Sequence, residues 1–202
     1  MLAPSELQAA LSSVRLVAVH GPWSRAVMFR HLLTRRSRLR PLWGGAARSE
    51  GGRFTPRESF DSIYLAWNAV TAFAEVQALL LLASGRLQPL AAPWVVMTVN
   101  GIVSAVLDLS DARTREHLGT NEQEISGFWK AGGLTPTQML GQAAFDCGRI
   151  VGFKYPSAKD RDGDNLVVFS DRVPLTPTNY LEVHDPDGHL SQRLGVERVR
   201  MV

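Results

Sequence analysis

The sequence predicts an α+β fold whose sheet is mixed or largely antiparallel. Segments of strand length and helix length follow one another without the regular strand–helix–strand alternation that builds a parallel sheet. No segment of roughly 20 to 50 residues recurs, which excludes a repeat protein. The chain has 202 residues, of which 45% are hydrophobic and 20% charged. This is an ordinary globular composition with enough length for one good-sized core, so we expect a single domain over residues 1–202.

The first third of the chain predicts one helix and two short strands. An amphipathic segment from Ser5 to Ser13 is the expected helix. RLVAVHGPWSRAV is rich in β-branched residues and is broken at Gly21-Pro22, which predicts two extended pieces with Arg25 on or beside the second. The connection that follows reaches Phe54 without periodicity, and connections of this kind are usually functional or mobile.

The middle of the chain predicts another strand, a helix and a longer extended region. SIYLA at residues 62–66 has the composition of a strand, and Asn68 is the expected N-cap of a helix that runs to about Ala83. PWVVMTVNGIVSAVLDLS predicts one or two strands, with an interruption at Asn100-Gly101.

The last part of the chain predicts two helices and a set of strands. Ser110 begins a short polar helix, DARTREHLG, and Thr135-Pro136 opens the helix TPTQMLGQAAFDCG. Three strand candidates follow: RIVGFKYPS, NLVVFS, and YLEVHD with QRLGVERVRMV behind a DPDGH turn.

Charge is concentrated in one place. The formal net charge is only +3, yet five arginines crowd between Arg30 and Arg40. A solvated segment is one interpretation, and a site for nucleic acid, a phosphate-bearing ligand or an acidic partner is another. Nucleic-acid binding has less support, because no stacking aromatic stands between these arginines.

The sequence favours a cytoplasmic protein without a membrane segment. The longest apolar run, Ala78 to Ala83, is far shorter than the roughly 20 residues of a spanning helix. The N-terminal MLAPSELQAALSS lacks the basic start and apolar stretch of a signal peptide. Cys147 is the single cysteine, which permits no internal disulfide and agrees with a reducing compartment.

Several common kinds of site, namely the Rossmann, P-loop, zincin and α/β-hydrolase sites, lose their best support because their motifs are missing. The chain has no G-x-G-x-x-G after a strand, no G-x-x-x-x-G-K-[ST], no H-E-x-x-H and no G-x-S-x-G. The five histidines are scattered, so we expect no metal site. DRDGD at residues 160–164 resembles a calcium loop only in part, since the closing glutamate is missing.

Glu75 is the least expected charged residue. It stands in AFAEVQALLLLA, a run that is otherwise almost all apolar. On a continuous helix it would share a small and apolar face with Thr71 and Leu79. An ionised carboxylate there needs a cation or several donors, or else takes up a proton. The sequence therefore predicts a partner for Glu75 and leaves open whether it is a structural arginine or a ligand in a cleft.

Two arginines are candidates for that partner or for a shared ligand. Arg53 follows Gly51-Gly52, a pair that lets backbone approach a ligand closely, and Arg25 lies on an apolar strand. Arginine side chains suit phosphates. Together with Glu75 they predict a pocket for an anionic, sugar-containing ligand such as a nucleotide.

Five short motifs follow one another in a specific order and spacing. They are W-S-R-A-V at 23–27, G-G-R-F-T-P at 51–56, I-Y-L-A at 63–66, T-A-F-A-E-V at 71–76, and Y-P-S-A with N-L-V-V-F between 155 and 169. In this order they resemble the RES domain family. The resemblance covers about residues 21–172, and we expect residues 173–202 to be a C-terminal extension.

The resemblance implies a fold similar to ADP-ribosyltransferases and an enzyme that consumes NAD. Members cleave the bond between nicotinamide and ribose, with water or phosphate as acceptor, so NAD is the substrate and no cofactor is expected. They are commonly the toxins of bacterial type II toxin–antitoxin pairs with an Xre-type helix-turn-helix antitoxin. The expected partners are NAD and such an antitoxin. We expect nucleic acid to be bound only by the antitoxin and not by this chain. A homodimer is a further option.

The resemblance also implies roles for individual residues. By position, Arg25, Glu75 and Ser157 correspond to the catalytic arginine, acidic and serine residues, and Arg53 and Tyr64 to residues that line the substrate pocket. Glu75 would stabilise positive charge on the ribose, while the arginines hold the diphosphate. Ser157 would orient the nicotinamide or its ribose, and Tyr64 would stack on or cap the ring. No histidine base accompanies Ser157, which argues against a nucleophilic serine.

Two departures from the family pattern leave alternatives open. Ser24 stands where many members have an aromatic residue, and the basic stretch after Arg30 looks like extra length. Arg30 is therefore a rival for the role of Arg25. Two other functional hypotheses are a non-catalytic module that binds nucleotide or nucleic acid, and an ADP-ribosyltransferase that modifies a macromolecule.

Overall fold

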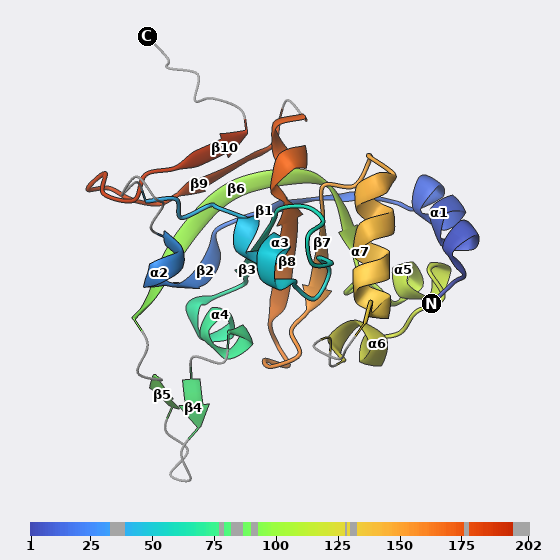
Figure 1. The fold of residues 1–202 in the computed structure, drawn as a ribbon, viewed down its shortest axis with the longest axis horizontal. Helices are drawn as coiled ribbons and strands as arrows, with labels where there is room; N and C mark the ends of the chain where they lie inside the picture. Colours follow the sequence, from blue (N-terminus) through green and yellow to red (C-terminus); the bar gives the residue numbers. More distant parts are fainter. Residues whose placement is uncertain are drawn as a thin grey trace.

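A computed structural model describes residues 1–32, 39–76, 79–81, 87–89, 93–127, 129, 133–175 and 178–195 (Figure 1). The strands are β1 (Val17–His20), β2 (Trp23–Met28), β3 (Ser62–Ala66), β4 (Leu79–Leu81), β5 (Leu87–Pro89), β6 (Trp94–Asp108), β7 (Gly152–Pro156), β8 (Asp164–Phe169), β9 (Tyr180–Val183) and β10 (Arg193–Gly195). The helices are α1 (Pro4–Ser13), α2 (Phe29–Leu32), α3 (Gly45–Glu50), α4 (Ala69–Glu75), α5 (Ala112–His117), α6 (Glu122–Ser126), α7 (Pro136–Asp146) and the 3-10 turn η1 (Ser170–Leu175).

The centre of the fold is a mixed sheet with the strand order β10-β9-β6-β2-β3-β8-β7, to which β1 adds by pairing with β6. The pairs in this sheet are antiparallel except for β6 with β7, which is parallel. Strands β4 and β5 pair separately and project from the body of the molecule (Figure 1). The predicted α+β class with a mixed sheet is confirmed.

Strand β6 connects the two sides of the sheet. It pairs with β1, β2 and β9 and, at its end, with β7. The interruption predicted at Asn100-Gly101 is wrong, because both residues stay in register with β9, opposite Glu182 and Leu181. A single continuous strand thus runs from Trp94 to Asp108.

Helix α4 is shorter than the sequence predicts. Asn68 is its N-cap as expected, and its side-chain oxygen accepts a hydrogen bond from the backbone N–H of Thr71 at 2.9 Å. The helix ends at Glu75, however, and Leu79–Leu81 form strand β4. The predicted end near Ala83 is therefore wrong. A short leucine run fits helix and strand equally well by periodicity, and here pairing with β5 decides.

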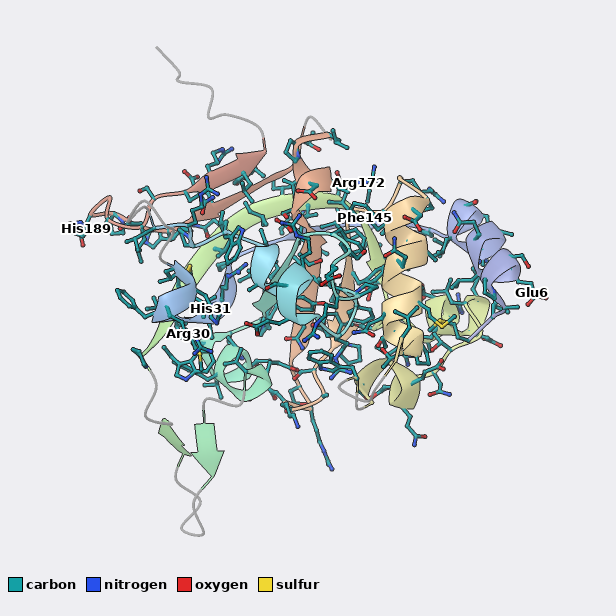
Figure 2. All side chains as sticks on the ribbon, viewed as in Figure 1. Glu6, Arg30, His31, Phe145, Arg172 and His189 are labelled. Atoms are coloured by element: carbon teal, nitrogen blue, oxygen red, sulfur yellow. The ribbon has the colours of Figure 1, made fainter. Side chains whose placement is uncertain are left out.

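Two apolar clusters pack on the sheet. One contains Phe54, Phe153 and Phe169 and lies beneath α1 and α7; the other contains Trp23 and Val99. At the edge of the first cluster the Arg172 guanidinium lies 4.6 Å from the centre of the Phe145 ring, and both are labelled in Figure 2.

Helix α7 fixes the loop that follows α3. A capping box at Thr135 starts the helix as predicted. Gln138 donates a hydrogen bond to the carbonyl oxygen of Gly52 at 3.0 Å. A Cβ at Gly141 would lie 1.7 Å from the carbonyl oxygen of Phe54, so only glycine lets the loop lie this close to the helix. The residues around Arg53 are thereby held against a regular element.

The remaining elements follow the prediction with few additions. The expected helices near residues 5–13, 111–118 and 135–146 are present, as are the expected strands on both sides of Gly21-Pro22 and after residue 150. Of the expected strand QRLGVERVRMV only Arg193–Gly195 is described as a strand, because residues 196–202 lie outside the described residues. The short helices α2, α3 and α6 were not predicted. Part of the basic segment, residues 33–38, lies outside the described residues. In the described part of the chain, no helix is both long and apolar enough to cross a membrane.

Candidate active site

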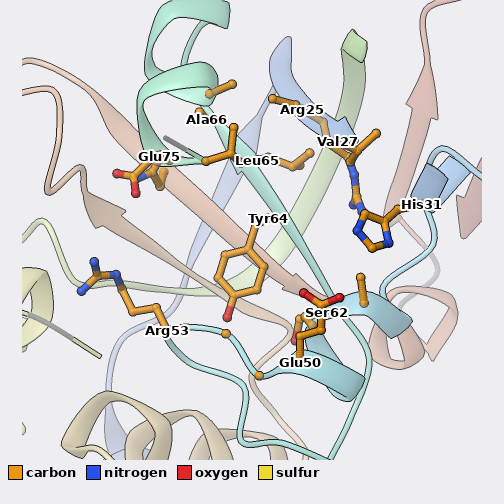
Figure 3. A pocket seen from close by; sticks show the side chains of 18 of the residues that line it. Arg25, Val27, His31, Glu50, Arg53, Ser62, Tyr64, Leu65, Ala66 and Glu75 are labelled. Atoms are coloured by element: carbon orange, nitrogen blue, oxygen red, sulfur yellow. The ribbon is translucent and has the colours of Figure 1, made fainter. Parts of the chain in front are cut away.

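Strands β2 and β3 are neighbours in the sheet but pair over only a small part of their length. Strand β2 pairs with β6 along its whole length but with β3 only where Ser24 stands opposite Ala66. Beyond this pair the two strands separate, and a cavity of about 1430 Å³ lies between them. Residues of β2, β3, α4, β7, β8 and the loop after α3 line it. Figure 3 shows Glu75, Arg53 and Tyr64 around this space.

Glu75, the last residue of α4, is held by two neutral donors. Its Oε1 accepts hydrogen bonds from the hydroxyl of Ser157 at 2.6 Å and from the side-chain amide of Asn165 at 2.8 Å. No arginine or lysine of the described residues forms an ion pair with it. The partner that the sequence predicts for Glu75 is therefore a pair of hydrogen-bond donors, and Oε2 is left without a donor from the described chain.

Ser157 belongs to a turn that is tied to α4 at two points. Its Oγ accepts hydrogen bonds from the backbone N–H groups of Lys159 and Asp160, at 3.1 and 3.0 Å. With these two bonds accepted, its single proton goes to Glu75. Asp160 in turn accepts a hydrogen bond from Thr71. Because Thr71 and Glu75 are four residues apart, they share one face of the helix and both grip the same turn.

Asn165 was missed as a site residue by the sequence. It is 1% exposed, and its cross-strand neighbours are Ala66 on β3 and Tyr155 on β7. The amide nitrogen donates to Glu75, but Oδ1 is buried and receives no hydrogen bond from the described residues. A polar residue facing inward at the start of the apolar strand NLVVF was the signal that could have revealed it.

Arg25 is a buried cation that forms no ion pair with any residue the structure describes. It is 8% exposed, and its Nη2 donates to the carbonyl oxygen of Trp43 at 2.8 Å. Its Nε and Nη1 are buried and meet no acceptor in the described part of the chain. Desolvation lowers the pKa of Arg25 to about 10. Buried charges are normally paired, so this guanidinium, which lines the cavity, has the properties of an anion site.

Arg30, the rival of Arg25, lies on α2 and also lines the cavity. It is exposed, and its Nε donates to His31 at 3.3 Å; both residues are labelled at the α2 side of the molecule in Figure 2. A solvated arginine pairs more weakly with an anion than a desolvated one. Of the two, only Arg25 has buried nitrogens that meet no acceptor among the described residues.

Arg53 lines the same cavity but has a structural duty. Its Nη1 donates to the carbonyl oxygens of Ile125 and Gly127, at 2.8 and 2.7 Å. These carbonyls lie at the C-terminal end of α6, where helix carbonyls lack partners within the helix. Arg53 therefore ties the loop after α3 to α6, with its side chain buried at 8% exposure.

Tyr64, on strand β3, lines the same cavity. Its hydroxyl accepts a hydrogen bond from the N–H of Phe54 at 3.0 Å and bonds to Thr55 Oγ1 at 2.9 Å. Burial raises the pKa of Tyr64 to about 12. A Cβ at Gly52 would lie 2.5 Å from the Tyr64 hydroxyl. We expected the glycine pair to admit a ligand, whereas Gly52 makes room for Tyr64.

The RES domain model matches residues 27–191 of the chain, the greater part of its length. The chain belongs to the RES domain family. The match begins two residues after Arg25, so the role of Arg25 depends on its motif and geometry. The match also extends beyond residue 172, where we expected an extension to begin.

Relatives of this RES-domain chain include the NAD(+) phosphorylase MbcT of Mycobacterium bovis and of Mycobacterium tuberculosis. Each is 30% identical over 152 residues, which cover 70% of this chain and 80% of the relative. A crystal structure of the M. tuberculosis MbcT–MbcA toxin–antitoxin complex contains a similar fold, with a TM-score of 0.68 and 24% identity over 96% of this chain and 94% of that one. This likeness shows that the two chains share a fold.

Proposed function

We propose that this RES-domain chain degrades NAD by cleaving the bond between nicotinamide and ribose, as the toxin of a toxin–antitoxin pair. The observation that carries the proposal is a carboxylate fixed by two donors, Glu75, in a cavity that also contains an uncompensated buried guanidinium, Arg25. The relatives named NAD(+) phosphorylase support the same substrate. They also favour phosphate over water as the acceptor.

Glu75 supplies the electrostatic part of the reaction. As the C–N bond breaks, its electron pair goes to nicotinamide, which leaves as a neutral molecule, and positive charge develops on the ribose. A preoriented carboxylate stabilises this charge mainly in the transition state. Oε1 is occupied by Ser157 and Asn165, so Oε2 faces the substrate. A phosphate oxygen then forms the new bond to the anomeric carbon of that ribose and loses its proton to solvent, so the product is ADP-ribose 1-phosphate.

Arg25 supplies the binding part. A diphosphate would accept from the buried Nε and Nη1, which lack acceptors in the described chain, and would compensate the charge of the guanidinium. Placing the diphosphate fixes the distance between the reacting bond and Glu75. The rings of Tyr64 and Tyr155 line the same cavity and offer apolar surface to the nicotinamide.

Ser157 takes a different role from the one that the resemblance implies. Its proton is donated to Glu75 and its oxygen accepts two backbone N–H groups. We therefore assign it to the positioning of Glu75 rather than to direct orientation of nicotinamide. Asn165 shares this role.

The partner proposed for this chain is an antitoxin protein. The structural relative was crystallised as a toxin–antitoxin complex. Four large apolar residues of this chain are each more than a third exposed: Phe29 on α2, Trp43 before α3, Trp67 before α4, and Val70 in its first turn. Exposed apolar residues of this size suit a protein partner. The Xre type of that partner, the restriction of nucleic acid to it, and a homodimer rest on the family resemblance. Co-expression with the product of a neighbouring reading frame, followed by co-purification, tests the pair.

The catalytic proposal is tested by incubating the purified chain with NAD, with and without phosphate. Release of nicotinamide together with ADP-ribose 1-phosphate supports a phosphorylase, and release with ADP-ribose alone supports hydrolysis. Transfer of labelled ADP-ribose to a protein or nucleic acid would instead support the ADP-ribosyltransferase alternative. Absence of NAD turnover with steeply salt-dependent nucleic-acid binding would support the non-catalytic module.

A further inference from the structure

The side chain of Asn165 is oriented by chemistry. A carboxylate can only accept hydrogen bonds, so the group that faces Glu75 Oε1 at 2.8 Å must be the amide nitrogen. The opposite orientation would place two oxygens against each other. Oδ1 therefore has a fixed direction, away from Oε1.

Oδ1 of Asn165 receives no hydrogen bond from the residues that the structure describes, although a buried oxygen requires a donor. Asn165 is 1% exposed and lines the cavity, and no described residue donates to this oxygen. A buried polar atom without a partner is costly and usually marks a bound water or a ligand. Glu75 Oε2 also receives no hydrogen bond from the described residues, but unlike Oδ1 it is accessible to solvent.

These two oxygens flank one hydrogen bond. Asn165 Nδ2 and Glu75 Oε1 form that bond, and the second heteroatom of each group, Oδ1 and Oε2, is left as an acceptor beside it. Two neighbouring acceptors match two neighbouring donors on a ligand. In NAD the vicinal hydroxyls of a ribose are such a pair, whereas the diphosphate bridge is fully ionised at neutral pH and has no proton to donate.

We propose that Asn165 Oδ1 accepts a hydrogen bond from one of the vicinal hydroxyls of the nicotinamide ribose, beside the carboxylate of Glu75. Asn165 is then a substrate-contacting residue as well as a donor to Glu75. This inference rests on the proposed NAD-degrading function and adds the group of the substrate that the site recognises. It also predicts that a nucleotide without this diol is processed poorly.

The test is a cycle of two proteins and three substrates. Wild type and Asn165→Leu are assayed for kcat/KM with NAD and with its 2′-deoxy and 3′-deoxy analogues on the nicotinamide ribose. Removing a hydroxyl also changes how easily the bond between nicotinamide and ribose breaks. This change is the same in both proteins. It therefore cancels when the ratio of kcat/KM for NAD to kcat/KM for the analogue is compared between wild type and Asn165→Leu. For one of the two analogues, wild type is expected to lose about tenfold more than Asn165→Leu, the magnitude of one lost hydrogen bond.

A matched variant separates contact from positioning. Ser157→Ala removes the other donor to Glu75 Oε1 and leaves Asn165 in place, so it should lower activity yet keep the wild-type preference for the diol. If Asn165→Leu fails to fold, Asn165→Asp replaces it. Asp keeps the acceptor and loses the donor to Glu75, so diol preference is retained while the two carboxylates shift the pH profile of kcat upward.

The outcomes distinguish this inference from the proposed function. An unaltered diol preference in Asn165→Leu overturns the inference while NAD turnover by wild type stands. A second control uses the acetylpyridine analogue of NAD, which lacks the amide N–H donors of nicotinamide. If Asn165→Leu changes the preference between NAD and this analogue, and not the preference between NAD and the deoxy analogues, Asn165 contacts the carboxamide and the inference is overturned. Absence of NAD binding and turnover in wild type would instead overturn the proposed function.

Discussion

The hydroxyl of Ser157 donates a 2.6 Å hydrogen bond to the carboxylate of Glu75, although 82 residues separate them in the chain. The bond joins the end of a helix to a turn between two strands, and the same turn is fixed to the helix by Thr71 and Asp160. A serine in this position orients a carboxylate without becoming a nucleophile.

Ser157→Ala is expected to lower kcat for nicotinamide release by about 10- to 100-fold, which corresponds to one hydrogen bond to a charged group. The turn also loses its acceptor for two backbone N–H groups, so the melting temperature should fall modestly. Ser49→Ala is the control, because Ser49 is exposed and bonds only within α3. An unchanged kcat in Ser157→Ala would contradict the positioning role.

Glu75→Gln should cost activity far more than stability. The amide keeps the size of the side chain but not the negative charge that the developing ribose cation requires, so we expect kcat to fall by about 10²–10³-fold. Unfolding in urea should change little. Glu116→Gln, at an exposed position on α5, should behave as wild type in both measurements. Retained NAD cleavage in Glu75→Gln would refute the assignment of the carboxylate.

Arg25→Met and Arg53→Met are expected to have opposite effects on stability. The pKa of Arg25 is lowered to about 10, which means that the folded chain bears a cost for the charge at neutral pH, relieved only as pH rises through about 10. Arg25→Met should therefore melt at the same or a higher temperature. Arg53→Met leaves the carbonyls of Ile125 and Gly127 without their donor and should lose about 1–3 kcal/mol.

Wild type and Arg25→Met should also differ in how strongly a ligand stabilises them. ADP-ribose at a hundred times its Kd should stabilise wild type by about 2.7 kcal/mol, seen as a shift of the melting transition. In Arg25→Met that shift should be largely lost, because the diphosphate has lost its buried cation. Equal ligand-induced shifts in wild type and Arg25→Met would exclude Arg25 as the phosphate-binding residue and return attention to Arg30.

Local pattern predicted the elements that build the site, but not how they meet. SIYLA forms β3 at the predicted residues and Asn68 caps α4 because alternation and capping are properties of neighbouring residues. The cleft depends on β2 and β3 pairing at one position only, which is a long-range property that neither strand encodes alone. The end of α4 was mispredicted for the same reason, since pairing of β4 with β5 competes with helix.

The chemistry of the site was predicted in part. The sequence indicated that Glu75 needs partners, and the physics of burying a carboxylate is independent of where these come from. Asn165, 90 residues away, was missed. Its importance comes from the register that sets it between Tyr155 and Ala66. Gly52 was recognised as a close approach, but the group that approaches is Tyr64.

Tyr64 allows a test of the site that does not depend on turnover. Burial raises its pKa to about 12, so folding favours the neutral phenol over the phenolate. Its contribution to stability is fully present below the unfolded value of about 10 and is lost as pH rises toward 12. Tyr64→Phe keeps the ring and removes the ionisation, as well as the bonds to Phe54 and Thr55.

The contribution of Tyr64 to stability is measured by urea unfolding of wild type and Tyr64→Phe. The measurements run from pH 8 to pH 11, a range of about three units around the ordinary tyrosine pKa. The difference in free energy of unfolding should be constant up to about pH 10 and then shrink as the wild type loses its advantage. Arg25, whose pKa is lowered by burial, is present in both proteins and cancels in the difference. Tyr155, whose pKa is raised first by burial and further by Glu75 and Tyr64, is replaced by Phe in both proteins so that it makes no contribution. A difference that stays constant to pH 11 would mean that the Tyr64 hydroxyl is solvated, and that the loop around Arg53 is not closed over it.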